Sequence, residues 1–559
     1  MNKRLFLKSA AAAIAFGTAL GLAACGGGGS SGGSAAPQAA TGKVTVAVTD
    51  APSADFNQVW ITIRRIDFNK AENATPNDPN WLSFPLAEPV TVDLAQLANG
   101  NMAEVFQDIE LPVGLYRQIR LVLVGEDEPL TASALAAGLQ YNDQVNFTGP
   151  TGVDRVAPLE IPHWRTGITV FGRFTVEQDK TLRLVLDFDI DNDVVVLPDA
   201  LSQTDGLAFT LKPFIRYYDL DLSGAIVGRI DPATLSPAAR PRGGYWAIVK
   251  AQDLSSDGSV HVVRRATSIR PDGSFTLFPV PVPSAGASKN YDITINGHNL
   301  QTSIVRGVPV VGGTTPTVNP TQLSAAPLAM ATGTEYGATL SSPAQPTGSW
   351  INFYQTLPGA TAPYQVRFRH VNPFNGHVDL PLLLPAGDLR VGDYVAGGAP
   401  VLSNVTPVEG SGGFSAIADA VLYSPGAPVL VTPPASGSVT TLAGSTLAVN
   451  AALAVPGTIN LAVTTMTPGR YDKGQFVITR FGFIVDSVAI DSVLASGGNI
   501  AAANLPAGTS GKPLPQGVYF GYLRVWNSNN PLIRPRIVPI FELADLRTTN
   551  SASLAVTLP

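Results

Sequence analysis

The chain of 559 residues contains one cysteine and five histidines, and only 14% of its residues are charged. A single cysteine permits no intrachain disulfide, so apolar packing and backbone hydrogen bonds must hold the folded part together. The low charge content and the net charge of −6 exclude a basic surface of the kind that nucleic acid requires, and we expect no nucleic-acid partner. The histidines show no paired metal-ligand spacing, and no nucleophile elbow or phosphate-binding loop stands in the body of the chain. The sequence therefore contains no recognisable catalytic constellation.

A sustained helical pattern is also missing. Apolar and polar residues instead alternate with a period of two, as in Val44–Val48 and Leu182–Ile190, which is typical of half-buried strands. The 54 glycines and 46 prolines are concentrated in the turns between such runs. One short helix is expected over residues 130–139, with Thr131 or Ser133 as its N-cap. We predict an all-β chain of tandem β-sandwich domains, transthyretin-like or immunoglobulin-like.

The N-terminus has the layout of an export signal. A basic segment (Lys3, Arg4 and Lys8) precedes the apolar run Ser9–Leu22, which is too short to span a bilayer as a mature helix. Ala23, Ala24 and Cys25, the only cysteine, follow this run, and Leu-Ala-Ala-Cys resembles the bacterial lipobox, in which the thiol is acylated. We predict a lipoprotein signal peptide over 1–24 and palmitate-type lipidation of Cys25. The alternative is an ordinary signal peptide followed by an incidental cysteine.

The segment after Cys25 predicts how the protein is displayed. Residues 26–42 are almost wholly Gly, Ser and Ala, and such a linker is a flexible coil with a reach of roughly 20–25 Å. Gly26, rather than Asp, occupies the second mature position, which by resemblance to Gram-negative sorting favours the outer membrane. We therefore expect a cell-envelope protein attached to the membrane by its N-terminal lipid and facing the periplasm or the exterior.

One turn sequence occurs three times. Leu111–Tyr116 and Leu514–Tyr519 share the pattern Leu-Pro-x-Gly-x-Tyr, and Leu384–Leu389 repeats it with leucine in place of tyrosine. Proline fixes the second turn position and glycine closes the fourth, as type I turns prefer. We expect each tyrosine to pack in the core while its hydroxyl satisfies a nearby backbone group, as in the tyrosine corner of immunoglobulin-like sandwiches. The three copies predict related sandwich units.

Two segments resemble known families. The first covers about Lys43–Tyr218, and the motifs that carry it are Val46–Pro52, Leu111–Tyr116, Gln118–Leu121, Leu186–Asp189 and Leu211–Ile215. With these motifs it resembles the bacterial domain of unknown function family 4382, which implies a secreted or lipid-anchored protein but no reaction. The second covers Ser223 to about Val311, with the expected strands Gly224–Ile230, Asp272–Leu277 and Tyr291–Gly297. It is similar to a carboxypeptidase-regulatory or transthyretin-like module, which implies a seven-stranded sandwich without catalytic residues.

These resemblances divide the chain into six parts. After the signal (1–24) and the lipidated linker (25–42) we expect the first domain at 43–220, the regulatory-like sandwich at 221–319, a β-rich domain at 320–435 and a C-terminal sandwich at 436–559. The last boundary rests on the Pro/Gly-rich stretch Pro433–Gly437.

The sharpest candidate site is an acidic strand end. Its members stand at every second position and are Asp187, Asp189, Asp191 and Asp193. Neighbours on one face of a strand are roughly 6.5 Å apart, so a single calcium ion would need a bend, which the turn-prone Asp191–Asp193 could supply. Asp50 could add a ligand, although the spacing lacks the glycine and glutamate of an EF-hand loop. The alternative is a solvated acidic face without a metal, and we expect no other cofactor.

The expected function is therefore non-catalytic: a lipid-anchored envelope protein that displays sandwich modules to another envelope component. Two alternatives remain. A glycan-binding module would use an exposed tryptophan, and Trp81, in the Pro/Asn-rich stretch Thr75–Pro85, is the expected candidate. An enzyme hidden after residue 320 would place His370 or His377 beside a carboxylate in a deep pocket.

Overall fold

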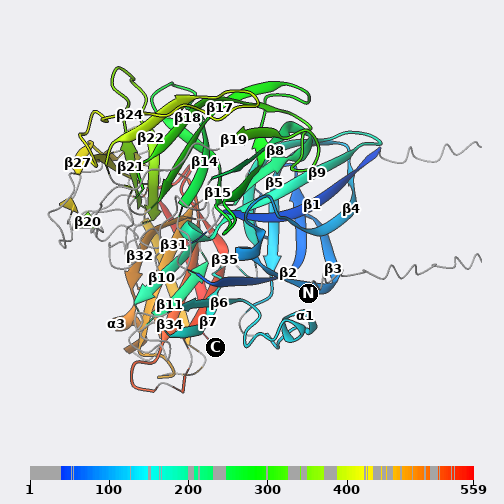
Figure 1. Ribbon diagram of the computed structural model, residues 1–559. Helices are drawn as coiled ribbons and strands as arrows, with labels where there is room; N and C mark the ends of the chain where they lie inside the picture. The colour runs from blue at the N-terminus through cyan, green and yellow to red at the C-terminus, as the bar shows by residue number, and fades with distance from the viewer. Residues whose placement is uncertain are drawn as a thin grey trace, which may run out of the picture. The chain divides into compact units, whose positions relative to one another are not determined.

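The computed structural model describes residues 40–558 apart from 199–206, 231–246, 325–339, 342–348, 371–384, 432–441, 450–457, 504–513 and several gaps of one to four residues. The signal segment, Cys25 and the Gly/Ser linker therefore lie outside the described residues. Within the described part, nearly every regular element is a β-strand (Figure 1). The prediction of tandem β-sandwiches is confirmed.

The first sandwich (residues 41–219) has two sheets around one apolar core that includes Val46, Ile61 and Phe188. One sheet has the order β12-β9-β1-β4, and the other has the order β10-β11-β7-β6-β2-β5-β8 with β3 paired to β2. The strands are β1 (Thr41–Ala51), β2 (Gln58–Asn69), β3 (Leu82–Asp93), β4 (Ala103–Pro112), β5 (Gly114–Leu123), β6 (Gln144–Thr148), β7 (Asp154–Glu160), β8 (Ile168–Val176), β9 (Thr181–Asp189), β10 (Val194–Pro198), β11 (Leu207–Leu211) and β12 (Arg216–Asp219).

Short helices join some of these strands. The expected helix is α1 (Ala132–Ala136), and Thr131 is its N-cap because its side chain accepts a hydrogen bond from the amide of Ala134 at 3.2 Å. A single turn, α2 (Ile190–Asp193), follows β9, and 3₁₀ turns cover Leu94–Leu97 and Leu220–Leu222.

The second sandwich (residues 223–324) packs its core from two sheets, β16-β13-β19 and the β18-β17-β14-β15 part of a larger sheet. Its seven described strands are β13 (Ser223–Arg229), β14 (Ala247–Leu254), β15 (His261–Ser268), β16 (Ser274–Pro281), β17 (Ser288–Gly297), β18 (Ser303–Val311) and β19 (Thr321–Ser324).

The third sandwich (residues 340–449) shares a ten-stranded sheet with the second. Its strands β22, β21, β25 and β27 continue that sheet beyond β15, and β23 and β24 extend its other edge beyond β18. The strands are β20 (Leu340–Ser341), β21 (Ser349–Gln355), β22 (Tyr364–His370), β23 (Leu389–Asp393), β24 (Ser403–Val405), β25 (Phe414–Ala420), β26 (Tyr423–Ser424), β27 (Val429–Val431), β28 (Leu442–Ala443) and β29 (Ala448–Val449).

The fourth sandwich (residues 458–558) consists of the sheets β33-β30-β36 and β32-β31-β34-β35. The elements are β30 (Thr458–Thr465), β31 (Lys473–Arg480), β32 (Phe483–Ala489), α3 (Asp491–Ala495), β33 (Asn499–Ala503), β34 (Val518–Trp526), β35 (Arg536–Asp545) and β36 (Ser551–Leu558).

One strand order recurs in all four sandwiches. Strands three, two, five and six form one sheet: β3-β2-β5-β8, β15-β14-β17-β18, β22-β21-β25-β27 and β32-β31-β34-β35. The numbering follows the chain but leaves out β23, β24 and β26 of the third sandwich, which pair elsewhere. That sandwich has no strand four among the described residues, so that β25, β27 and β28 are its strands five, six and seven. The first strand belongs to the opposite sheet, where it pairs in parallel with the seventh. In the first sandwich β6 and β7 are inserted between strands five and six, so that β9 is its seventh strand. The sandwich units are therefore related in topology.

Two copies of the recurring turn sequence lie at the same place in this shared strand order. Tyr116 and Tyr519 both stand at the start of strand five and are fully buried, and the Tyr116 hydroxyl donates to the carbonyl of Pro112 at 2.8 Å. The tyrosine corner predicted at Tyr116 is confirmed. The sequence pattern missed its counterpart in the second sandwich, Tyr291, which is 1% exposed and donates to the carbonyl of Pro281.

The third copy of the turn pattern, Leu384–Leu389, does not stand at the start of strand five. It opens β23, which pairs with β18 and lies outside the shared strand order of the third sandwich. There the fully buried Phe414 begins strand five. Leu389, which replaces the tyrosine of the pattern in this copy, is nevertheless buried.

Candidate functional site

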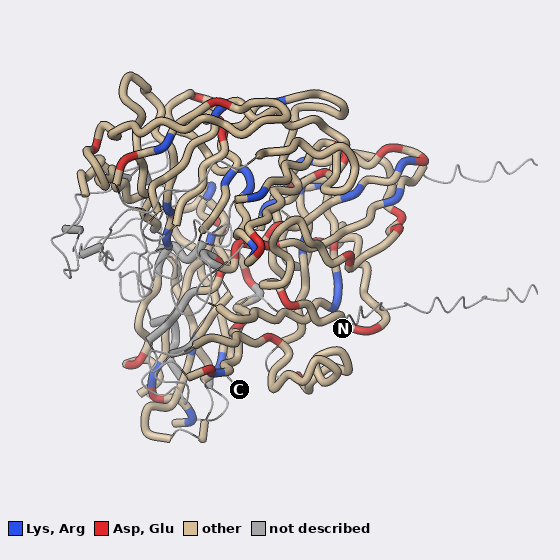
Figure 2. The backbone as a smooth tube through the Cα atoms, viewed as in Figure 1, with Lys and Arg blue, Asp and Glu red and all other residues tan. Residues whose placement is uncertain are grey.

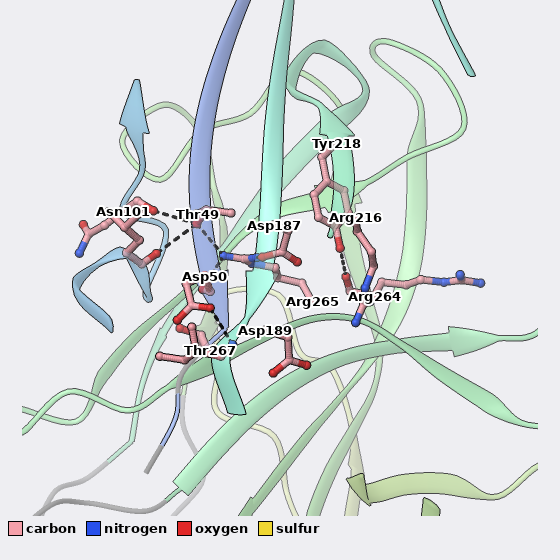
Figure 3. Close-up of polar contacts among 12 residues, drawn as sticks. Thr49, Asp50, Asn101, Asp187, Asp189, Arg216, Tyr218, Arg264, Arg265 and Thr267 are labelled. Carbon is pink, nitrogen blue, oxygen red and sulfur yellow. Dashed lines mark hydrogen bonds and ion pairs between the residues drawn. The ribbon is translucent and has the colours of Figure 1, made fainter. Parts of the chain in front are cut away.

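The predicted acidic residues gather where β1 and β9 end. The two strands run parallel in the register Thr49↔Asp187 and Ala51↔Asp189, so the carboxylates of both strands reach the same end of the sheet (Figure 3). Asp193 belongs to the turn α2 that follows. The structure therefore brings together Asp50, Asp187 and the segment from Asp189 to Asp193. The side chain of Asp191 lies outside the described residues.

Three of these carboxylates are buried, so the expectation of a solvated acidic face is wrong for them. Asp50 is fully buried, Asp187 and Asp193 are 6% and 1% exposed, and Asp189 is partly exposed. On β9 the alternation of buried and exposed residues holds at Thr181–Leu184 and is lost from Val185 onward, where both faces are buried. The reason is tertiary: β15 of the second sandwich packs against β1 and covers the outer face of this sheet.

Arg265 of β15 enters this acidic cluster. Its guanidinium, 1% exposed, pairs with Asp187 through Nη1. Nη2 donates to the hydroxyl of Thr49 at 3.0 Å and to the carbonyl of Asp50 at 3.2 Å. One arginine of the second sandwich thus binds two adjacent strands of the first, and the two sandwiches meet in a buried ion pair (Figure 3). We call Thr49, Asp50, Asp187, Arg216, Tyr218 and Arg265 the ionic junction.

Hydrogen bonds fix the groups around Arg265. The Thr49 hydroxyl lies 3.1 and 2.9 Å from the carbonyls of Leu97 and Asn101, to which it donates. The Asp50 carboxylate accepts from the Ile190 amide at 3.1 Å, and the Asp193 carboxylate accepts from the Asp189 amide at 2.9 Å. These bonds hold α2 against β1, so the acidic segment has a defined shape.

Burial and charge shift the protonation equilibria of the junction. Burial raises the pKa of Asp50 well above its usual value, and the nearby carboxylates of Asp187, Asp189 and Asp193 raise it further, against the lowering effect of the Ile190 amide. Burial also raises the pKa of the Tyr218 hydroxyl, which donates to the carbonyl of Arg264. Two features therefore limit the negative charge of the junction: the positive charge of Arg265 on β15, and the raised pKa of Asp50, which favours its protonated, neutral form.

Arg216 supplies a second cation beside these carboxylates. Burial lowers the pKa of its guanidinium, but the neighbouring Tyr218, Asp187, Asp189 and Asp193 raise it, and the net change is upward. Arg216 also donates to the carbonyl of Val263 on β15 at 3.2 Å. It therefore stays charged and adds a further bond between the two sandwiches.

The positions of these carboxylates can be compared with what a calcium site requires. Among the described residues, no three His, Cys, Asp or Glu side chains are placed to hold a metal ion. Arg265 occupies the position beside Asp187 that a cation would take. Binding of calcium by Asp50, Asp187, Asp189, Asp191 and Asp193 remains a prediction for experiment.

Other junctions also consist of buried polar contacts. The Lys250 ammonium and the Asn296 amide of the second sandwich both donate to the carbonyl of Val366 on β22, at 2.6 and 2.9 Å. Between the first and fourth sandwiches, Glu160 of β7 pairs with Arg524 of β34 at 3.3 Å, and both side chains are less than 10% exposed. In a chain with sparse charge (Figure 2), several of its ionic groups join one sandwich to another.

The remaining candidate residues have other roles or lie outside the described part. Trp81 is half-buried rather than exposed: its indole donates to the carbonyl of Thr75 at 2.7 Å, and the Arg120 guanidinium stacks 4.2 Å from its ring. It anchors its loop. The side chain of His370 and all of His377 lie outside the described residues.

Sequence reasoning missed Arg265 and its neighbours. Arg264 and Arg265 are adjacent, so on a strand they point to opposite faces and only one can enter a buried junction. The one signal in the sequence was the group of aspartates at the end of β9, because several carboxylates can be buried together only when cations compensate their charge. Nothing in the sequence indicated which strand supplies them.

Comparison with known proteins identifies one segment. Residues 41–213 match the family described as a domain of unknown function (DUF4382), so the resemblance found for the first domain is confirmed. No curated protein matches the chain.

Solved structures give only remote likenesses. The Bacillus anthracis TIE protein has 10% identity and a TM-score of 0.13, with 91% of this chain and 73% of that chain covered. A streptococcal ancillary pilin has 12% identity and a TM-score of 0.12, covering 60% and 98%. The major pilin subunit of Bacillus cereus has 12% identity and a TM-score of 0.09, covering 72% and 99%. At these TM-scores the likeness defines no shared arrangement.

Proposed function

We propose that this chain is a non-catalytic lipoprotein of the cell envelope whose four sandwiches form a scaffold that displays a binding or structural surface. The observation that carries the proposal is the ionic junction. Arg265 of the second sandwich bonds to both Asp187 and Thr49 of the first, and all three are buried, so their chemistry is used to fix neighbouring domains. A scaffold requires this kind of fixed connection between its modules.

The membrane attachment rests on the sequence. Cys25 follows the predicted signal peptide (1–24) and precedes a Gly/Ser linker. As a separate finding, no helix in the described part of the chain is long and apolar enough to cross a membrane. A diacylated or triacylated Cys25 would provide a stable anchor, because two or more acyl chains bind a bilayer firmly. The second sandwich serves as a spacer in this proposal, and its seven strands in two sheets support the likeness to carboxypeptidase-regulatory modules.

Metabolic labelling with a palmitate analogue tests the anchor. The wild type should be labelled and sediment with membranes, and Cys25→Ala should be unlabelled and released. A labelled or membrane-bound Cys25→Ala protein would overturn the assignment. Gly26→Asp serves as the matched variant for sorting: it should keep the label and move the protein from the outer to the inner membrane.

A second experiment addresses the absence of catalysis. The purified mature chain should turn over none of a panel of ester, peptide and glycoside substrates. Turnover that persists through repurification would refute the scaffold and favour an enzyme in the part of the chain after residue 320.

A further inference from the structure

The four sandwiches share a parallel pairing of their first and seventh strands. Among the described residues, this ladder contains nine residue pairs in the first sandwich (β1 with β9) and eight in the fourth (β30 with β36). It contains four pairs in the second sandwich (β13 with β19) and two in the third (β20 with β28). Of the ladder pairs that the structure describes, most therefore belong to the first and fourth sandwiches.

Parallel pairing determines how a sandwich responds to tension. The N-terminal end of the first strand and the C-terminal end of the seventh lie at opposite ends of their ladder. When the fourth sandwich is pulled at its two chain ends, at Thr458 and Leu558, its two strands must slide past each other. In the first sandwich the chain continues from β9 through β10, β11 and β12, and β12 pairs antiparallel with β9. These three strands must detach before tension reaches the C-terminal end of β9 and makes it slide along β1. Because the hydrogen bonds of a parallel pair are evenly spaced and slanted, they are loaded together. Two antiparallel neighbours pulled from the same end instead separate one bond at a time.

We propose that the chain transmits mechanical tension, and that the β1–β9 ladder of the first sandwich and the β30–β36 ladder of the fourth are its mechanically strongest parts. Tension that enters through the linker acts directly on β1, and tension that leaves at the C-terminus acts on β36. These two strands belong to the ladders of nine and eight pairs. The role of Cys25 as the point where load enters rests on the proposed function, but the resistance of the ladders does not depend on the lipid.

The core packing of the first and fourth sandwiches reinforces their ladders. Val44, Val46 and Val48 alternate along β1 with at most 1% exposure, and Leu461 and Val463 do the same on β30. Sliding either strand by one residue would turn this apolar set out of the core, since side chains alternate with a period of two. The ladder bonds and the core are therefore lost in the same step, which makes the transition abrupt.

Optical-tweezers measurements on the unlipidated mature chain test the proposal. Cys25 is the only cysteine, so it accepts one handle, and the C-terminus accepts the other. The contact between Glu160 and Arg524 must open before the sandwiches are pulled in line. Strands β10–β12 of the first sandwich and the third sandwich should then yield first, and the β1–β9 and β30–β36 ladders last. The fourth should add roughly 330 Å of chain between Thr458 and Leu558, and the first roughly 500 Å between Lys43 and Asp189.

A matched pulling direction separates ladder strength from overall stability. In a Cys25→Ser background, Arg470→Cys and Leu532→Cys place both handles beyond the same end of β31 and β34, where Lys473 pairs with Trp526. Arg470 and Leu532 are exposed, so the core of the fourth sandwich is unchanged. This geometry peels antiparallel neighbours apart, and the same sandwich should unfold at a severalfold lower force.

Equal unfolding forces in the two directions would overturn the proposal, as would a β1–β9 or β30–β36 ladder that yields before the third sandwich. Neither result depends on acylation. Failure of the palmitate labelling would remove the anchor and leave the force measurements unaffected, so the two ideas can fail separately.

Discussion

Replacement of Arg265 by alanine tests whether the ionic junction joins the first two sandwiches. The substitution removes the cation that binds the Asp187 carboxylate, which is 6% exposed, and leaves only the neighbouring Arg216 to compensate its charge. Removing one member of a buried ion pair costs up to about 3–5 kcal/mol, because the remaining charge is not hydrated. The lost hydrogen bond to Thr49 adds less, since that hydroxyl still has the carbonyls of Leu97 and Asn101 as partners.

Hydrogen exchange read by mass spectrometry provides a local assay for this loss. The amides of β9 and β15 should exchange roughly 10²–10³-fold faster in Arg265→Ala, because each 1.4 kcal/mol is about a tenfold change in an equilibrium constant. Exchange in β31 and β34 of the fourth sandwich should be unchanged. This local readout avoids a single free energy of unfolding, which is not defined when several domains unfold separately.

The adjacent arginine supplies the matched control. Arg264 pairs with Asp253 on the same strand pair, and its own side chain is 37% exposed. Asp253 keeps Lys289 as a second cation when Arg264 is replaced. A half-exposed pair with a remaining partner contributes about 0–1 kcal/mol, so Arg264→Ala should change exchange less than tenfold. The double variant Arg265→Met with Asp187→Leu should recover much of the lost protection, since buried pairs can be replaced by apolar groups of similar size. Similar exchange in the two alanine variants would refute the reasoning.

Three further predictions concern single groups. Burial raises the pKa of Asp50 in the folded state, so the folded protein binds this proton more tightly than the unfolded chain does. The stability of the wild type therefore falls as pH rises from about 3.8 through the folded pKa, and Asp50→Asn should gain stability relative to wild type between about pH 4 and 8 in urea melts. Parallel stability curves for the two proteins would contradict this. Tyr116→Phe should lower the unfolding free energy of the first sandwich by about 1–2 kcal/mol, because the carbonyl of Pro112 loses its donor; an unchanged urea midpoint would count against the tyrosine corner. Millimolar calcium should raise the melting temperature no more than magnesium or sodium at equal ionic strength, since Arg265 already neutralises Asp187; a calcium-specific rise that Asp189→Asn abolishes would establish the metal site.

The recurring turn shows which structural features a local sequence pattern can predict and which it cannot. Leu111–Tyr116 and Leu514–Tyr519 correctly identified the start of strand five, because proline and glycine fix the turn whatever surrounds it. The same pattern at Leu384–Leu389 opens β23, which joins the sheet of the preceding sandwich. A turn sequence determines a local bend, whereas the strand that follows pairs with whichever edge lies nearby.

The sequence by itself determined the strands, their buried faces at Val44–Val48 and the resemblance of the first domain to its family, because alternation, turn residues and local motifs are properties of neighbouring positions. Only the tertiary structure decided what the aspartates at the end of β9 do. Asp187 and Arg265 are 78 residues apart. Whether a carboxylate is hydrated, binds a metal ion or pairs with an arginine depends on what covers it, and here a strand of the next sandwich does.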